Sequence, residues 1–283
     1  MKNIDDKEYI ADGHSFGLLK DTPKFPFHID LELNTSCNLN CKMCDRTGFE
    51  EGELSLVGAK KIIKYCADNG TKSIKPFWRG ESTIYKDIIE VLKYAQQCGL
   101  KTMINTNGLF DSEMSIRLSR YLDWVSFSID EGHGNHKSKT VLTNLELFSN
   151  PDFFKGHCQV ESGTSNRKLI SKLHEINKNI YVDMFTKRTD EADYDFFDLE
   201  GYPRKYCGFP EFRMIITWKG EMKPCCVCWK DGELSMGYID GNLDNIKNAW
   251  NTRFYKLRKE LKQNIFTEDI CKNCQSKKAY DVS

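Results

Sequence analysis

Strand-like and helix-like segments alternate from residue 28 to about residue 185, and this alternation constrains the fold more than any other feature of the sequence. The first strand-like run, 28–34, has Ile29, Leu31 and Leu33 at alternate positions, as in a strand with a buried face. Ser55 is typical of a helix N-cap. Further strands are predicted at 73–78, 101–106, 124–129, 159–162 and 180–185, and helices at 55–69, 85–98, 111–122, 139–149 and from about 166. Repeated β/α units of this kind predict a parallel sheet with right-handed crossovers.

The predicted fold class is therefore α/β: a partial (β/α)6 barrel of parallel strands with a small C-terminal metal-binding module, a β-hairpin plus a helix. The hairpin is expected around Lys219-Gly220 and the helix at 243–262. A module of this size is too short to fold on a hydrophobic core alone, which favours stabilisation by a metal. The expected divisions are an N-terminal extension at 1–26, the barrel at 27–186, a linker or lid at 187–206, and the C-terminal module at 207–283.

Charge and composition exclude some classes of function. Lys plus Arg and Asp plus Glu both number 41, so no overall basic field favours nucleic acid or an anionic membrane. No apolar run is long enough to span a bilayer, and the first ten residues lack the pattern of a signal peptide. We therefore expect a cytoplasmic protein whose twelve cysteines stay reduced, serving as metal ligands where they cluster and as small buried hydrophobes elsewhere.

Three of these cysteines, Cys37, Cys41 and Cys44, lie close together just after the first predicted strand. Three thiolates at this spacing can hold three corners of a cubane iron–sulfur cluster, for which four protein ligands are usual. The fourth iron would then be open to a small molecule, as the open position of a catalytic zinc site is. The triplet therefore predicts a reactive metal centre.

Polar residues also stand beyond the ends of the next three predicted strands. Arg79-Gly80-Glu81-Ser82 follows the second strand, Asn107 follows the third, and Asp130-Glu131 follows the fourth. The carboxyl ends of parallel strands meet at one edge of the sheet, where ligand sites of such folds lie. We expect these residues and the cysteines to form one site.

The cysteine spacing and these residues together resemble the radical S-adenosylmethionine (SAM) superfamily. The resemblance implies a [4Fe–4S] cluster on the three cysteines, with SAM bound to the open iron. Gly80 and Glu81 match two positions of the family's Gly-Gly-Glu-Pro motif, although the first glycine and the proline are absent. A local turn in which Ser82 caps the next helix stays open as an alternative. The resemblance implies that the residues contacting SAM are Met43, Arg79, Gly80, Glu81, Ser82, Asn107, Ser128 and Lys139.

The C-terminal cysteines resemble the SPASM domain, in its shorter version called twitch. The resemblance implies a second, auxiliary [4Fe–4S] cluster held by Cys207, Cys225, Cys271 and Cys274. From the residues alone, a zinc site made of Cys225-x-x-Cys228 and Cys271-x-x-Cys274 stays open. The gap between those pairs is longer than the roughly 15–20 residues typical of such sites. Cys228 is the first candidate for a substitute ligand.

The resemblance implies an oxidoreductase that reductively cleaves SAM to a 5′-deoxyadenosyl radical. This radical would take a hydrogen atom from a small hydroxylated substrate such as a sugar, aminocyclitol or nucleotide, and the auxiliary cluster would take the second electron. Candidate catalytic residues are Asp130, Glu131 and Arg188, of which Arg188 is a poor base and a better anchor for an anion. The expected partners are a small molecule or a peptide, and an electron donor such as flavodoxin or ferredoxin. Two alternatives stay open: a maturase of a ribosomally made peptide, and a non-catalytic metal-binding protein.

Overall fold

The predicted partial barrel is confirmed in the computed structural model, which describes residues 22–41, 44, 46–129, 138–148, 156–161, 175, 181–185 and 207–272. Within these ranges, eight strands form one sheet in the order β6-β5-β4-β3-β2-β1-β7-β8, and every neighbouring pair is parallel except β7 with β8. The strands are β1 (His28–Leu31), β2 (Ser73–Pro76), β3 (Lys101–Thr106), β4 (Trp124–Ile129), β5 (Gly156–Glu161), β6 (Tyr181–Phe185), β7 (Arg213–Ile216) and β8 (Met222–Lys223).

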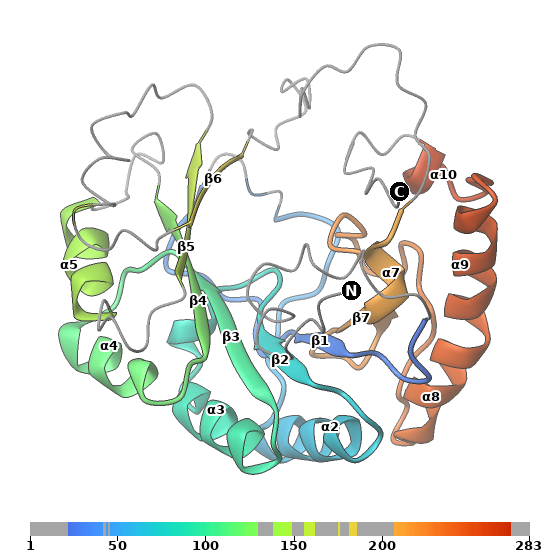
Figure 1. The fold of residues 1–283 in the computed structure, drawn as a ribbon, viewed down its shortest axis with the longest axis horizontal. Coiled ribbons are helices and arrows are strands. Elements are labelled where there is room, and N and C mark those ends of the chain that lie inside the picture. The colour runs from blue at the N-terminus through green and yellow to red at the C-terminus, as the bar shows by residue number, and fades with distance from the viewer. Residues whose placement is uncertain are drawn as a thin grey trace, which may run out of the picture.

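The helices lie along the outside of the curved sheet, with α2 to α5 on one side of β1 and α8 and α9 on the other (Figure 1). The longer helices are α2 (Leu56–Asp68), α3 (Ile88–Gln97), α4 (Ser112–Ser119), α5 (Ser138–Phe148), α8 (Asp244–Asn251) and α9 (Arg253–Lys262). The short ones are η2 (Ser82–Ile84), α7 (Phe209–Phe212) and α10 (Asp269–Lys272).

Local sequence signals account for most of these boundaries. The side chain of Ser55 accepts a hydrogen bond from Gly58 N at 3.1 Å and begins α2, and Asp111 begins α4 through Met114 N at 2.7 Å. Both are the N-cap interactions expected of these residue types. The single helix predicted at 243–262 is instead two helices, because the backbone at Thr252 (φ −118°, ψ −80°) departs from helical geometry. The predicted helix from about residue 166 and the linker at 187–206 lie outside the described residues.

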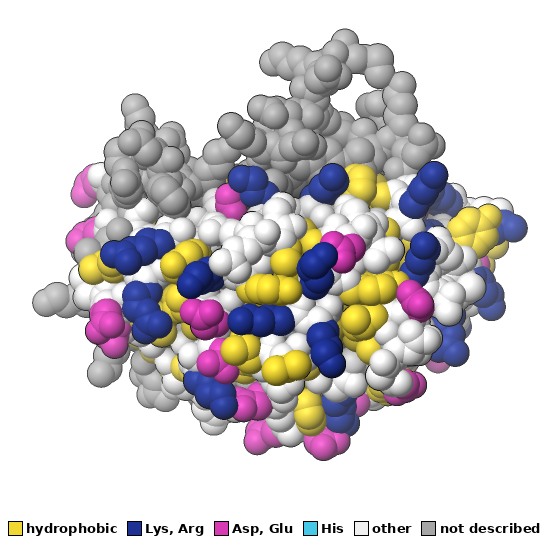
Figure 2. Space-filling view, turned by 90° about the horizontal axis from the view of Figure 1, so that it is seen from below, with side chains coloured by type: hydrophobic (Ala, Val, Ile, Leu, Met, Phe, Trp, Pro, Cys, Tyr) yellow, Lys and Arg dark blue, Asp and Glu magenta, His cyan; other side chains and the backbone are white. Residues whose placement is uncertain are grey.

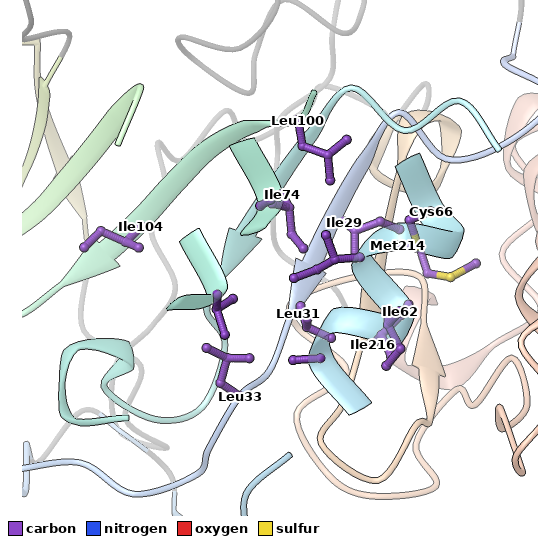
Figure 3. Close-up of a cluster of buried hydrophobic side chains, with 14 of the residues drawn as sticks. Ile29, Leu31, Leu33, Ile62, Cys66, Ile74, Leu100, Ile104, Met214 and Ile216 are labelled. Carbon is purple, nitrogen blue, oxygen red and sulfur yellow. The ribbon is translucent and has the colours of Figure 1, made fainter. Parts of the chain in front are cut away.

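The hydrophobic core fills the space between the sheet and its helices. Alternate strand residues point to opposite faces, and Ile29 and Leu31 of β1 are fully buried on the face toward α2. Figure 3 shows them beside Ile74, Met214 and Ile62, which come from β2, β7 and α2. The side chains of His28 and Asp30 therefore lie on the opposite face of the same strands. We call this face the inner face.

The C-terminal hairpin continues the main sheet. Residue by residue, β7 pairs with β1 in parallel, from His28 with Arg213 to Leu31 with Ile216. The turn to β8 contains Gly220 at φ +80°, a conformation that glycine adopts without strain. The helices after the hairpin add Trp250 to the same buried cluster as β1. The hairpin that leads to Cys225 and Cys228 is thus fixed to the barrel through a shared sheet and core.

Charged side chains of both signs are interspersed on the face that includes α2 and α3 (Figure 2). Among the described residues, no helix combines the length and the apolar character that a bilayer span requires.

Candidate functional site

The loop that carries Cys37, Cys41 and Cys44 follows the carboxyl end of β1. Cys37 and Cys41 are half-buried, and Cys44 is exposed. The loop turns back on itself through a hydrogen bond from Cys44 N to Cys41 O at 3.0 Å. Leu39 N donates to Cys37 Sγ at 3.4 Å, and burial raises the pKa of the Cys37 thiol.

Among the described residues, no three cysteine, histidine or acidic side chains converge on a point where a single metal ion would bind. A cubane does not require such convergence, because each thiolate binds a different iron atom. Cys37, Cys41 and Cys44, three thiols on one short loop, form a donor set that suits a cluster better than one ion.

The turn after β2 is pressed against the start of the cysteine loop at Gly80. A Cβ atom added to Gly80 would lie 2.4 Å from Asn34 O and 2.7 Å from Ser36 O, so only glycine fits there. The main chains are joined as well, since Glu81 N donates to Ser36 O at 2.8 Å. The side chain of Asn34 adds hydrogen bonds to Ser36 O at 3.1 Å and to Glu81 O at 3.3 Å. The two predicted parts of the SAM site are therefore held together by backbone contacts.

The Glu81 carboxylate joins this turn to the end of β3. It accepts hydrogen bonds from Thr106 Oγ1 and Asn107 N, both at 2.8 Å, and from Thr83 Oγ1 at 2.7 Å. Burial raises the pKa of Glu81, although these bonds oppose the rise. Because its oxygens are occupied in this way, Glu81 fixes the turn after β2 relative to the end of β3. Ser82, the next residue, donates its hydroxyl to Pro76 O at the end of β2.

Asn107 lies against the cysteine loop. Its side-chain amide donates to Asn38 Oδ1 at 2.7 Å and lies 3.9 Å from Cys37 Sγ. Ser128, on β4, is half-buried and pairs in register with Gln159 of β5. The predicted residues Gly80, Glu81 and Asn107 are thus brought to the cysteines.

Arg79 directs its side chain elsewhere. Its guanidinium forms a two-point ion pair with Glu32, at 2.6 and 2.8 Å, and contacts Asp231 at 2.7 Å. The side chains of Arg79 and Glu32 are fully buried, and the guanidinium lies 4.4 Å from the ring centroid of Phe49 and 4.5 Å from that of Trp78. With its side chain occupied by these groups, only the backbone of Arg79 is left for a cofactor. The sequence analysis missed Glu32 and Asp231.

The C-terminal cysteines approach one another after β8. Val227 N donates to Cys225 Sγ at 3.4 Å, and Cys228 N donates to Cys225 O at 3.2 Å. Cys226 lowers the pKa of the Cys225 thiol, but the effects of Cys228, burial and the charge of Cys207 outweigh it and raise this pKa well above its usual range. Cys228 is buried and Cys271 half-buried. Cys228 therefore lies beside Cys225, which is consistent with its predicted role as a substitute ligand.

A second group of charges, also missed by the sequence analysis, lies on the inner face. Asp30 of β1 pairs with Arg213 of β7 at 2.5 Å and with Lys75 of β2 at 3.2 Å. His28 lies 3.2 Å from Asp30 and 2.8 Å from Ser73 Oγ. Burial lowers the pKa of His28 to about 4, so its imidazole is neutral near pH 7. Burial opposes ionisation of Asp30, but Arg213 and Lys75 outweigh it and hold the pKa of Asp30 below its usual range.

Five predicted residues lie outside the described part of the chain: Met43, Asp130, Glu131, Arg188 and Cys274. The backbone of Lys139 lies in α5, but its side chain is also outside the described set. The roles predicted for these residues stay predictions.

Known proteins resemble this chain in two ways. A model of the SPASM family, described as an iron–sulfur cluster-binding domain, matches residues 207–275. An S-adenosylmethionine-dependent nucleotide dehydratase of Lacinutrix mariniflava is 25% identical over 175 residues, 58% of this chain and 34% of that protein. An AdoMet-dependent heme synthase of Methanosarcina barkeri is 30% identical over 191 residues, 59% of this chain and 54% of the relative. The chain thus spans about a third to a half of the length of these relatives.

Two solved structures share the fold. BtrN in complex with AdoMet and 2-DOIA has a TM-score of 0.59 at 19% identity, covering 89% of this chain and 93% of that one. SuiB of Streptococcus suis bound to S-adenosylmethionine has a TM-score of 0.63 at 15% identity, covering 89% and 71% of the two chains. The match over residues 207–275 shows a SPASM-type iron–sulfur cluster-binding domain at the C-terminal end. With the cysteine loop and its Gly-Glu turn, the sequence relatives make the chain similar to radical SAM proteins, and the solved structures show that it shares their fold.

Proposed function

We propose that the protein is a radical SAM enzyme in which Cys37, Cys41 and Cys44 hold a [4Fe–4S] cluster beside a SAM-binding turn at Gly80-Glu81. The close approach at Gly80 carries this proposal, because it fixes the turn's backbone groups next to the cysteine loop. When bound, such a cluster supplies the electron for homolytic cleavage of SAM and hence for hydrogen-atom abstraction from a substrate.

The residues of this chain have supporting roles in that proposal. Glu81 holds the turn against the end of β3 through its accepted hydrogen bonds. Asn107 presents its amide toward Cys37 Sγ, and hydrogen bonds to cluster sulfurs are one of the factors that set a cluster's reduction potential. Ser128 and Lys139 are the further predicted contacts of SAM.

The finer proposal is dehydrogenation of a small hydroxylated substrate. Cys207, Cys225, Cys271 and Cys274 would hold an auxiliary [4Fe–4S] cluster that accepts the second electron, and the SPASM match includes all four positions. Asp130 and Glu131 are the candidate bases, and Arg188 a candidate anchor. A low-potential donor such as flavodoxin or ferredoxin would reduce the first cluster.

The test is an iron count with product analysis on anaerobically reconstituted protein. Two cubanes predict about eight irons per chain and release of 5′-deoxyadenosine from SAM under a strong reductant. A variant in which Cys37, Cys41 and Cys44 are all alanine should keep about four irons and release none. As a control, Cys66→Ala, which changes a buried cysteine of α2, should keep all the iron. Wild-type protein that holds its iron but releases no 5′-deoxyadenosine would contradict the proposed activity, and four irons plus one zinc would contradict the second cluster.

A further inference from the structure

The inner-face cluster of Asp30, Lys75 and Arg213 carries one more positive charge than negative. Lys75 and Arg213 are both cationic and share the single carboxylate of Asp30. His28 adds no charge near pH 7, since burial lowers its pKa to about 4. An unmatched cation in a protein interior is costly unless an anion accompanies it. Among Asp30, Lys75 and Arg213, negative charge is therefore one short of positive, and Cys225 and Cys226 are further groups whose charge acts on Arg213.

The two cations also have unused hydrogen-bond donors. Arg213 Nε is buried and has no hydrogen-bond partner among the described residues. Lys75 Nζ pairs with Asp30 at 3.2 Å, whereas an ammonium has three donors and a guanidinium five. Buried donors without partners are rare in native structures and call for an explanation.

Both cations are held in place and are not fully buried. The Lys75 side chain is 12% exposed and that of Arg213 14%, although they stand on strands inside the sheet. Phe77 lies under Lys75, with its ring centroid 5.0 Å from Nζ, and Phe209 under Arg213, with its centroid 4.5 Å from the guanidinium carbon. Two oriented cations, one of them with an unpartnered Nε donor, have the chemistry that recognises a carboxylate or phosphate group.

The cluster also lies where a substrate of the proposed enzyme would need to be held. Asp30 is on β1, whose carboxyl end leads into the cysteine loop. Arg213 is near enough to Cys225 and Cys226 for their charges to act on it. A group bound by Lys75 and Arg213 would thus lie on the barrel's inner face, between the first strand and the C-terminal cysteines.

We propose that Lys75 and Arg213 bind an anionic group of the substrate, a carboxylate or a phosphate, with Asp30 holding the two cations in position. This inference rests on the proposed function and adds that the substrate is an anion.

Calorimetric titration of reconstituted holoprotein with inorganic phosphate, and separately with acetate, tests the site. Wild-type protein should bind at least one of the two, and the stronger binder identifies the group. Lys75→Met and Arg213→Gln should each weaken that binding by about tenfold or more. Lys86→Met is the matched control, because its side chain is 74% exposed and lies 4.0 Å from Glu53, and it should bind as wild type does. No binding of either anion, or equal binding by all four proteins, would overturn the proposal.

Asp30→Asn tests the sign of the effect. Removing the carboxylate raises the surplus from one positive charge to two, so phosphate or acetate should bind several-fold more tightly. Unchanged or weaker binding by folded Asp30→Asn protein would show that the charged group of Asp30, Lys75 and Arg213 is only structural. A change in the auxiliary cluster's midpoint potential in Arg213→Gln, with unaltered anion affinity, would show that the cations serve the metal centre and would also overturn the proposal. Release of 5′-deoxyadenosine by wild-type protein without substrate tests the radical chemistry separately, so the two failures can be told apart.

Discussion

Replacement of Arg79 by methionine should destabilise the protein strongly. The Arg79–Glu32 ion pair is fully buried on both sides, and removing one partner of such a pair costs about 3–5 kcal/mol. Without Arg79, the Glu32 carboxylate keeps the backbone hydrogen bond from Trp218 N at 3.2 Å. The contact with Asp231, whose side chain is 23% exposed, adds about 0–1 kcal/mol. Since each kcal/mol shifts the melting temperature by about 2–4 °C in a chain of this size, the loss should be about 6–24 °C.

The cause can be separated from loss of packing by a second substitution. If the stranded Glu32 charge is responsible, Arg79→Met/Glu32→Met should recover much of the lost melting temperature, because apolar replacements of a buried ion pair are often neutral or stabilising. Thermal unfolding under anaerobic conditions, followed by far-ultraviolet circular dichroism, measures both variants. Lys86→Met, at an exposed ion pair, should melt within about 4 °C of wild type.

The opposite result would refute this reasoning. If the double variant is no more stable than Arg79→Met, the charge of Glu32 is not the cause. The stabilisation would then come from the stacking of the guanidinium on Phe49 and Trp78.

Three further predictions concern the cysteine-loop contact, a helix cap and pH. Gly80→Ala should cost about 3 kcal/mol because its Cβ meets backbone, and it should abolish 5′-deoxyadenosine release; Gly241→Ala, at φ +76° in open space, should cost about 1 kcal/mol and keep the release. Ser55→Ala should lower the melting temperature by about 2–4 °C through loss of the cap on α2. The pKa of His28 is about 4 in the fold against 6.5 unfolded, so the unfolded chain binds more protons between these values. Stability should therefore fall as pH decreases from 6.5 toward 4, by at most about 1.4 kcal/mol per pH unit from this group, and melting curves of His28→Gln should show a shallower decline.

The sequence alone predicted the elements whose signals are local. The strands at 101–106 and 124–129 lie where the strand-like runs of the sequence predicted them. Ser55 and Asp111 begin helices as their residue types favour. These features depend on neighbouring residues, which one sequence displays fully. The sequence predicted a C-terminal module distinct from the barrel, but in the structure β7 of that module pairs with β1 of the barrel. This pairing joins segments far apart in the chain, so no local signal reports it.

The role of Arg79 shows why the site was harder to predict than the fold. Its place before Gly80 suggested a contact with SAM, but its guanidinium pairs with Glu32, 47 residues earlier, and Asp231, 152 residues later. No local pattern reports such separations. The motif predicted the position of the backbone turn, and the distant partners decide the direction of the side chain.

The inner-face charges had a signal in the sequence, but an incomplete one. A strand covered on both faces is normally apolar throughout, whereas His28, Asp30 and Glu32 alternate with the apolar residues of the first strand. That alternation marks a polar inner face, yet the partners of Asp30 come from β2 and β7, whose register is set by the whole sheet. Relatives that resemble this chain in sequence carry different names, from nucleotide dehydratase to heme synthase, and a shared fold does not by itself select a substrate. Selection then comes from side chains rather than from the backbone, and the group of Asp30, Lys75 and Arg213 on the inner face is one set of side chains suited to that role.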